Sequence, residues 1–250
     1  MLITDDRGLG KVVEPFPRPT DGSADRIASE LEQDIVFGRL LPAQKLREEE
    51  LSARFMVSRH QVRAALASLE RVGIVTKERN KGAAVRSFTS EEVQQICEIR
   101  EMLQRQAALR IPLPVDPSTI TKLEEIQARY EAAILAGDYS TIHRTNDQFH
   151  TELFCLCGNL FLSQLIRQYM DLSYVIRANA FSPEHLLVAR TEHRLMLRLL
   201  GSTDSWALAQ LCVDHIQYSK HKYLAMVSLP DSERQPPWMA EELLDRGAVT

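Results

Sequence analysis

Residues 48–86 read EEELSARFMVSRHQVRAALASLERVGIVTKERNKGAAVR, and this stretch decides the fold expected for the first part of the chain. Its start predicts a short amphipathic helix, because Leu51 and Phe55 are four residues apart and share one face. A second helix is expected to begin at Ser58, since Ser58 and Gln61 match the Ser-x-x-Gln capping box, which satisfies free N–H groups at a helix start. The second helix carries an apolar stripe made of Val62, Ala65, Leu66, Leu69 and Val72.

The second helix begins with polar side chains that point away from this stripe. They are Ser58, Arg59, His60 and Arg63. Two short helices, a tight turn and an exposed basic start on the second helix are typical of a helix-turn-helix, whose second helix enters the major groove of DNA. Two short strands, 74–77 and 84–87, are expected around the polar tip 79–82 and would form a wing.

The charge of residues 54–86 also favours contact with phosphates. This segment has eight Lys and Arg but only two acidic residues, whereas the whole chain has a formal charge of −4. The basic residues are Arg54, Arg59, Arg63, Arg71, Lys77, Arg79, Lys81 and Arg86. A basic segment on an acidic protein is typical of a module that binds nucleic acid. The alternative is a solvated, Arg-rich helical hairpin in an all-α protein.

The composition indicates a soluble globular protein of one or two domains, with 250 residues, 44% hydrophobic and 26% charged. The chain has neither an apolar run of the ~20 residues that a membrane span needs nor a signal peptide. Its four cysteines lie within helical patterns and lack Cys-x-x-Cys spacing. They are expected to be reduced thiols in a cytoplasmic protein.

A helix over 24–37 is expected to pack behind the helix-turn-helix. The remaining patterns divide the chain into four segments. The segments are a flexible tail at 1–20, a winged helix-turn-helix domain at 21–88, an all-helical domain at 89–228 and a second tail at 229–250.

The all-helical segment begins at a Thr-x-x-Glu capping box formed by Thr89 and Glu92. Prolines and glycines mark the ends of its helices, which are expected at 90–110, 117–136, 139–157, 160–180, 183–200 and 205–228. Short links and the absence of an internal repeat favour an antiparallel six-helix bundle over a solenoid. The fold class is therefore mainly α, with a small β wing.

Several polar side chains fall on apolar faces of these helices. Arg100 lies in the stripe of the first helix, and His193 and His215 lie in the stripes of the last two. Asn146 and His150 are one turn apart on one face. A buried Arg needs an anion or several acceptors, and imidazoles from three helices can supply a metal site. The alternative is a set of hydrogen-bonded core histidines without a metal.

The N-terminal motifs resemble the GntR family of bacterial transcription regulators. The resemblance rests on residues 38–46, 51–55, 57–59, 62–66, 69–70, 73–75 and 81–83. There are two departures. The family usually has Pro-Gly where this chain has Pro42-Ala43, and it often has Thr-Pro at His60-Gln61, a change within the recognition helix.

The second half resembles the FCD ligand-binding domain, so the chain as a whole looks like a FadR/VanR-like GntR regulator. That domain is known for an Asp-x-x-x-His pair and two later histidines, which bind a divalent metal such as zinc or nickel. Asn146 stands at the Asp position here and adds no negative charge, so weaker metal binding is expected. The resemblance implies a metal site at Asn146, His150, His193 and His215. It also implies that Arg100 faces the effector pocket.

The resemblance implies a homodimeric repressor that binds palindromic double-stranded DNA. The residues expected to contact DNA are Arg54, Ser58, Arg59, His60, Gln61, Arg63, Lys81 and Gly82. A small organic acid is expected between Arg100 and the metal, because an Arg forms bidentate pairs with a carboxylate. His143 and Arg177 are expected on solvated helix faces.

Two further functions use the same histidines. In a metal-responsive regulator the metal itself would be the signal. In a metal-dependent enzyme His150, His193 and His215 would leave one coordination position open, although the sequence contains no motif for a catalytic base or nucleophile.

Overall fold

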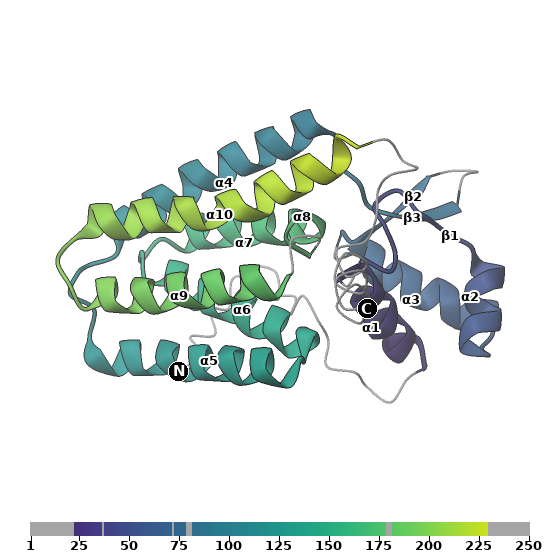
Figure 1. The fold of residues 1–250 in the computed structure, drawn as a ribbon, viewed down its shortest axis with the longest axis horizontal. Helices are drawn as coiled ribbons and strands as arrows, with labels where there is room; N and C mark the ends of the chain where they lie inside the picture. Colours follow the sequence, from purple (N-terminus) through teal and green to yellow (C-terminus); the bar gives the residue numbers. More distant parts are fainter. Residues whose placement is uncertain (1–22, 37, 72, 79–81, 179–181, 230–250) are drawn as a thin grey trace, which may run out of the picture.

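The computed structural model describes residues 23–36, 38–71, 73–78, 82–178 and 182–229. The described chain has a small N-terminal part with three helices and a sheet, followed by a larger helical part (Figure 1). The tail predicted at 1–20 and all but the first residue of the tail predicted at 229–250 lie outside the described residues.

Three helices form the N-terminal part, as predicted: α1 (Ser23–Val36), α2 (Glu48–Phe55) and α3 (Arg59–Arg71). Their apolar stripes meet in one core, in which Ile27, Leu31 and Leu66 are fully buried. α2 ends at Phe55, and Met56 caps it with a left-handed backbone of φ 53°. This conformation reverses the chain between α2 and α3 and gives the helix-turn-helix geometry.

The wing is a three-stranded antiparallel sheet in the order β1-β3-β2. Its strands are β1 (Lys45–Leu46), β2 (Val75–Glu78) and β3 (Gly82–Val85). The predicted strands differ from β2 and β3 by one or two residues at each end. β1 was not predicted, because two residues are too few to show an alternating pattern. Residues 79–81 of the wing tip lie outside the described residues.

Seven helices form the larger part within the described residues. They are α4 (Ser90–Arg110), α5 (Pro117–Ala136), α6 (Tyr139–Cys155), α7 (Leu160–Leu172), α8 (Tyr174–Ala178), α9 (Pro183–Leu200) and α10 (Ser205–Val227). The predicted capping box at Thr89 and Glu92 is present, and Asp116 caps α5. The all-helical prediction is therefore confirmed, with one correction.

The correction concerns the single helix predicted over 160–180, which is divided into α7 and α8 at Ser173. Ser173 is fully buried, and its Oγ donates a hydrogen bond to the carbonyl oxygen of Tyr169 over 2.7 Å. A hydroxyl that bonds back to the preceding turn bends a helix. In the sequence Ser173 is one of two serines in a stretch with helical periodicity and without an internal Pro or Gly, so nothing there indicated this break.

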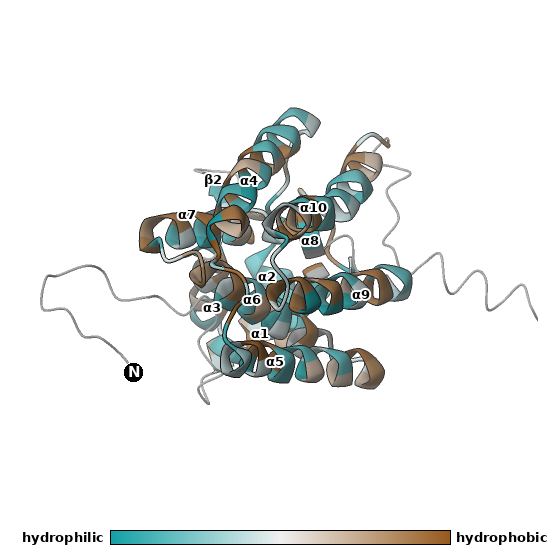
Figure 2. Ribbon diagram, turned by 90° about the vertical axis from the view of Figure 1, so that its left-hand side faces the viewer, coloured by the Kyte–Doolittle hydropathy of each residue, from teal (hydrophilic) through white to brown (hydrophobic). Residues whose placement is uncertain are grey.

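The helices pack around a second apolar core. α4 lies beside α10, and α5 packs on α6 and α9 (Figure 1). Single helices carry both hydrophobic and hydrophilic residues (Figure 2), and the buried ones include Phe149, Leu153, Met196 and Leu208. None of the described helices combines the length and the apolar composition needed to cross a membrane.

The two parts share an apolar junction. Tyr174, Val175 and Ile176 of α8 belong to the same buried cluster as the core of the winged helix. Tyr223 of α10 is fully buried there, and its Oη accepts a hydrogen bond of 3.0 Å from the backbone N–H of Phe88. This bond joins the C-terminal part of α10 to the link between the wing and α4.

Candidate metal centre and DNA-binding face

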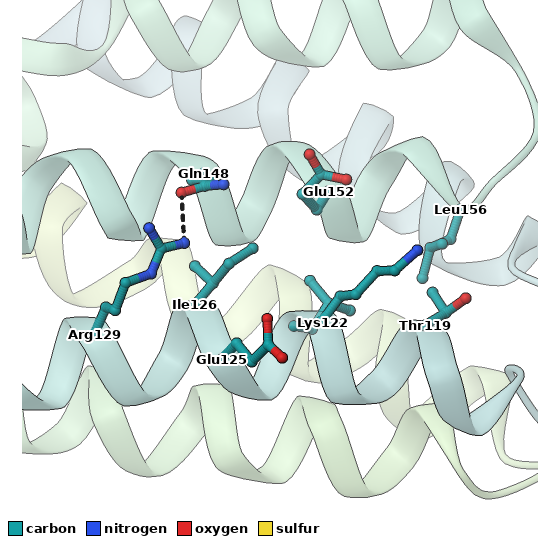
Figure 3. Close-up of a pocket in the computed structure, with 9 residues that line it drawn as sticks. Thr119, Lys122, Glu125, Ile126, Arg129, Gln148, Glu152 and Leu156 are labelled. Carbon is teal, nitrogen blue, oxygen red and sulfur yellow. Dashed lines mark hydrogen bonds between the residues drawn. The ribbon is translucent and has the colours of Figure 1, made fainter. Parts of the chain in front are cut away.

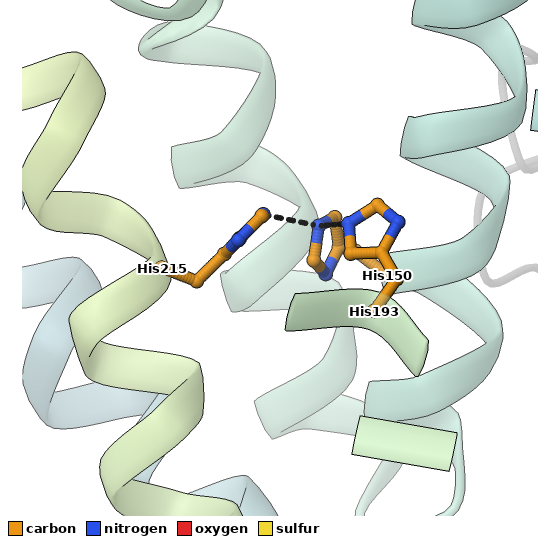
Figure 4. Close-up of side chains that lie close together, drawn as sticks. All are labelled: His150, His193 and His215. Carbon is orange, nitrogen blue, oxygen red and sulfur yellow. Dashed lines mark hydrogen bonds between the residues drawn. The ribbon is translucent and has the colours of Figure 1, made fainter. Parts of the chain in front are cut away.

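Three histidines from three helices converge in the helical part. His150 lies on α6, His193 on α9 and His215 on α10, and their ligand atoms are all within 4.8 Å of one another (Figure 4). The Nε2 of His150 is 3.1 Å from the Nε2 of His215 and 3.3 Å from that of His193. His150 and His193 are buried. The prediction that these side chains face one centre agrees with this arrangement.

Outer hydrogen bonds fix the orientation of two of the rings. The Nδ1 of His193 is 3.0 Å from the amide oxygen of Gln127, and the Nδ1 of His215 is 2.5 Å from Glu192 Oε2. Both oxygens only accept hydrogen bonds, so each Nδ1 carries the proton. The Nε2 lone pair of His193 and of His215 is therefore directed at the centre, as in metal sites whose histidines are held by outer-shell acceptors.

The protonation state of the histidines also suits a metal. Burial lowers the pKa of His150 well below its usual value, and the neighbouring His215 and His193 lower it further. Burial, followed by His215 and His185, does the same for the pKa of His193. Both rings are neutral near pH 7, which is the form that binds a metal.

Two of the donor separations fit a small divalent ion. With Zn–N bonds of about 2.0–2.1 Å, tetrahedral ligand atoms lie about 3.3 Å apart. The two separations that involve His150, 3.1 and 3.3 Å, are close to this value. Asn146 is half-buried one turn before His150 on α6. An imidazole set such as this one suits zinc or nickel better than magnesium or calcium.

Arg100 is the second buried feature expected to face the effector. Its side chain lies on α4 with 5% exposure, and its Nε and Nη1 have no hydrogen-bond partner among the described residues. Burial, together with the nearby Arg177 guanidinium, lowers the pKa of Arg100 to about 10, so it remains charged at neutral pH. A buried, charged group with unused donors is costly unless an anion joins it.

The structure corrects the expectation for His143 and Arg177, because both are buried. Arg177 Nη1 donates a hydrogen bond of 2.6 Å to Asp147 Oδ1, and His143 Nδ1 is 3.6 Å from Asp147 Oδ2. The sequence did not indicate this ion pair, because α8 follows a break that it did not reveal. Asp147 points to Arg177 and not to the histidine centre, as its position beside Asn146 predicts.

The sequence analysis also did not find the two residues that hydrogen-bond to the histidine rings, Gln127 and Glu192. Gln127 lies between Leu123 and Tyr130 on the buried face of α5, so its position in an apolar stripe was a signal that could have found it. Glu192 is next to His193 in the sequence but contacts His215 of another helix. That contact depends on helix packing, which the sequence does not show.

The recognition helix presents a basic, exposed surface. The Arg59 guanidinium forms an ion pair with Glu49, and Arg63 Nε is 2.7 Å from Glu48 Oε2, with 57% and 62% of the two arginine side chains exposed. His60 is also exposed. The predicted capping box of α3 is present, since Gln61 Oε1 accepts from the N–H of Ser58.

The other residues expected at DNA have mixed positions. Arg54 is half exposed and lies 2.6 Å from the buried carboxylate of Asp34. Gly82 begins β3 and is exposed, with φ +82°, a conformation that favours glycine. Lys81 lies outside the described residues.

A groove of about 260 Å³ lies elsewhere, between α5 and α6 (Figure 3). Lys122, Glu125, Arg129 and Glu152 line it, and Arg129 Nη2 donates a 3.1 Å hydrogen bond to Gln148. None of the three histidines lines this groove. Its mixed charges do not favour one ligand, so the histidine centre remains the candidate site.

Comparisons with known proteins identify both parts. The gntR family of bacterial regulatory proteins matches residues 23–85, and the FCD domain matches residues 95–218. The HTH-type transcriptional regulator YdhC of Bacillus subtilis is 27% identical over 192 residues, 76% of this chain and 86% of that protein. The repressor RspR of Escherichia coli is 25% identical over 208 residues, 82% of this chain and 90% of that protein.

A solved structure shows the same fold. A GntR transcriptional regulator of Rhodococcus sp. RHA1 superposes with a TM-score of 0.56 and 22% identity, over 81% of this chain and 97% of that one. The matched families and relatives are regulators, so the alternative of a metal-dependent enzyme is not supported. The chain belongs to the GntR family of bacterial transcription regulators and carries a DNA-binding winged helix-turn-helix followed by an FCD domain.

Proposed function

We propose that this regulator is a homodimeric repressor whose affinity for a palindromic operator is changed by a small organic acid bound at a metal site in the helical part. The domain boundaries are those of the sequence prediction. Residues 21–88 would bind DNA, and residues 89–228 would bind the ligand. The observation that carries the effector proposal is the presence of two features in the helical part, a three-histidine centre and a buried Arg100 with unused donors.

The metal would be held by His150, His193 and His215, with Asn146 as a fourth, neutral ligand. Zinc or nickel bound there would act as a Lewis acid for a carboxylate oxygen. Gln127 and Glu192 keep two of the rings oriented, and burial lowers the pKa of His150 and of His193, which keeps these two rings neutral. Arg100 then offers a fork of N–H donors to a carboxylate of the ligand.

The metal is tested by elemental analysis of the purified protein beside a His150→Ala/His215→Ala variant. About one zinc or nickel per subunit, lost in the variant, is the expected result. Equal metal content in both proteins would contradict the site, and an absence of metal in both after incubation with Zn²⁺ would favour structural histidines.

The ligand is tested by calorimetry with a panel of small mono- and dicarboxylic acids. Arg100→Ala is expected to abolish binding of whichever acid the unmodified protein binds, because the carboxylate loses its charged partner. Arg105→Ala on the same helix is the matched control, since its guanidinium contacts Gln210 at the partly exposed surface. Unchanged binding to Arg100→Ala would contradict the assignment.

On DNA, the start of the recognition helix of each subunit would enter a major groove. The residues proposed to lie there are Ser58, Arg59, His60, Gln61 and Arg63. Arg59 and Arg63 are proposed to bind guanine edges or phosphates, and the wing tip with Lys81 and Gly82 would approach the backbone, beside Arg54. Two-fold symmetry of a dimer implies a palindromic site. The name of the relative RspR, a repressor, supports repression here.

A duplex selected from a random pool by the unmodified protein provides the operator for a gel-shift assay. Arg59→Ala and Arg63→Ala are each expected to weaken binding about tenfold or more, in line with ~1–3 kcal/mol for a good base contact. Arg110→Ala, on the exposed end of α4, is the control. If all three variants bound the operator with the same affinity, the proposal that Arg59 and Arg63 contact DNA would be wrong.

A regulator in which the metal itself is the signal is the second candidate, because the three histidines alone already form a metal-binding set. Operator binding that responds to Zn²⁺ after chelator treatment, with no organic acid present, would favour this function over the first.

A further inference from the structure

A polar contact joins the winged helix to the helical part through an otherwise apolar junction. Tyr174 of α8 is 2% exposed, and its Oη donates a hydrogen bond of 2.7 Å to Glu32 Oε1 on α1. The residues around it, such as Val175 and Ile176, are fully buried. A carboxylate and a hydroxyl at such a place keep only the partners that the fold gives them, so their contact is sensitive to the relative position of α1 and α8.

The same tyrosine is in contact with the helix that carries part of the histidine centre. Its ring lies on the ring of His143, with 4.2 Å between the ring centroids. His143 is followed one turn later on α6 by Asp147, whose carboxylate binds Arg177 of α8 over 2.6 Å. Thus α8 is fixed to α6 at both ends of one turn, by a ring contact and by a buried ion pair.

α6 extends directly from these contacts to the centre. Asp147 is next to Asn146 and precedes His150 by one turn of the same helix. A ligand or metal that moves His150 or reorients this part of α6 therefore acts on Asp147 and His143, and through them on α8. Helices in a packed core move as rigid elements, and close packing transmits such displacements.

On the other side, α1 is attached to the recognition helix. α1 packs along α3, and Gln61 of α3 donates a hydrogen bond to Ser23 Oγ of α1. A displacement of α1 would therefore also displace α3, which carries the residues proposed to bind DNA.

We propose that the Tyr174–Glu32 hydrogen bond is the contact through which occupancy of the histidine centre changes the position of the winged helix. This inference rests on the proposed function, in which a ligand of the helical part alters operator binding. Tyr174 and Glu32 are positioning residues, since they contact neither DNA nor the histidine centre. The coupling requires that the ligand prefer one of two arrangements of α8 and α1.

The test uses the full-length protein and Zn²⁺ as the probe, with backbone amide exchange as the readout. In the unmodified protein Zn²⁺ is expected to slow exchange in α6 and α9 and to change it in α1 by about fivefold relative to α2, a size typical of weak allosteric coupling. The ratio of α1 to α2 removes any uniform stabilisation of the winged helix. Tyr174→Phe keeps the ring but lacks the hydroxyl, so it should retain the response of α6 and α9 and lose that of α1.

Two further variants keep the test specific. Glu32→Ala removes the acceptor and should cause the same loss, and the double variant should show no additional loss, because both changes break one contact. Tyr169→Phe on α7 removes a hydroxyl from a half-buried tyrosine and should leave the α1 response unchanged.

An α1 response that is equal in Tyr174→Phe and in the unmodified protein would overturn the inference and leave the proposed function intact. A Zn²⁺ response in α6 and α9 with none in α1 would do the same. Absence of any Zn²⁺ effect on α6 and α9 would contradict the metal site and the inference together.

Discussion

At the scale of the residue, two partly buried glutamates with hydrogen-bond partners set local chemistry in this molecule. Glu192 fixes the His215 ring by accepting a hydrogen bond from its Nδ1–H, so the other ring nitrogen faces the centre. Glu32 shows an effect of burial, because desolvation raises the pKa of its carboxyl group to about 7 despite the opposing hydrogen bond from Tyr174. Substitution of each of these two glutamates is expected to have a measurable effect, on Zn²⁺ affinity for Glu192 and on the pH dependence of stability for Glu32.

Glu192→Gln is expected to lower Zn²⁺ affinity about tenfold, the lower end of the effect of losing an outer-shell partner. Competition with a chelator of known affinity measures the change. Glu184→Gln provides the control, since Glu184 is exposed on the same helix. Equal affinities of the two variants would show that Glu192 does not support the site.

Glu32 predicts a pH dependence of stability. Its pKa is about 7 in the folded protein and near the ordinary glutamate value of 4.5 in the unfolded chain, so the folded state holds the proton more tightly. Its contribution is therefore fully present below pH 4.5 and lost as the pH rises through 7. Urea unfolding of Glu32→Gln between pH 5 and 8 should show a smaller loss of stability than the unmodified protein. Glu30→Gln, with 43% of the Glu30 side chain exposed, should behave like the unmodified protein.

At the scale of the element, α2 and α3 differ in charge where they face each other. At the start of α2, Glu48 forms an ion pair with Arg63, and Glu49 forms one with Arg59. These ion pairs are exposed, so each contributes little to stability, about 0.2–1 kcal/mol. DNA has to replace these carboxylates before the arginines contact bases or phosphates.

The double variant Glu48→Gln/Glu49→Gln should therefore bind the selected operator more tightly. An increase of about two- to fivefold for each broken pair follows from the strength of exposed ion pairs, and the gain should shrink as salt is added. Glu124→Gln on α5 is the control, far along the chain from the recognition helix. Weaker binding of the double variant would mean that the carboxylates hold the arginines in the orientation that DNA requires.

At the scale of the whole molecule, the winged helix and the bundle are joined by a continuous apolar core. Polar contacts at this junction include the hydrogen bond of Tyr174 to Glu32 and that of Tyr223 to the backbone of Phe88. A buried N–H without an acceptor costs about 1–3 kcal/mol, so the second connection is expected to matter for stability.

Tyr223→Phe leaves the Phe88 N–H without this acceptor. The free energy of unfolding should fall by about 1–3 kcal/mol in a urea titration. Tyr218→Phe, which changes a half-buried tyrosine on the same helix, should have a smaller effect. Equal stability of the two variants would show that the backbone of Phe88 finds another partner.

The sequence determined the elements and the kind of chemistry. Local signals were sufficient for α2, α4, α5 and α9, because caps, prolines and helical periodicity act within a few residues. The same periodicity placed Arg100, His193 and His215 on buried or partly buried faces, since a helix fixes which residues share a face.

The tertiary structure decided how these faces meet. The break at Ser173, the Asp147–Arg177 ion pair, the Gln127 and Glu192 contacts and the Tyr174–Glu32 bond all join residues of separate helices or interrupt a regular pattern. Such contacts depend on helix packing and on the angle between elements, which periodicity along one chain does not contain. For this reason the sequence identified the three histidines, whereas only the structure revealed what orients them and what connects them to the winged helix.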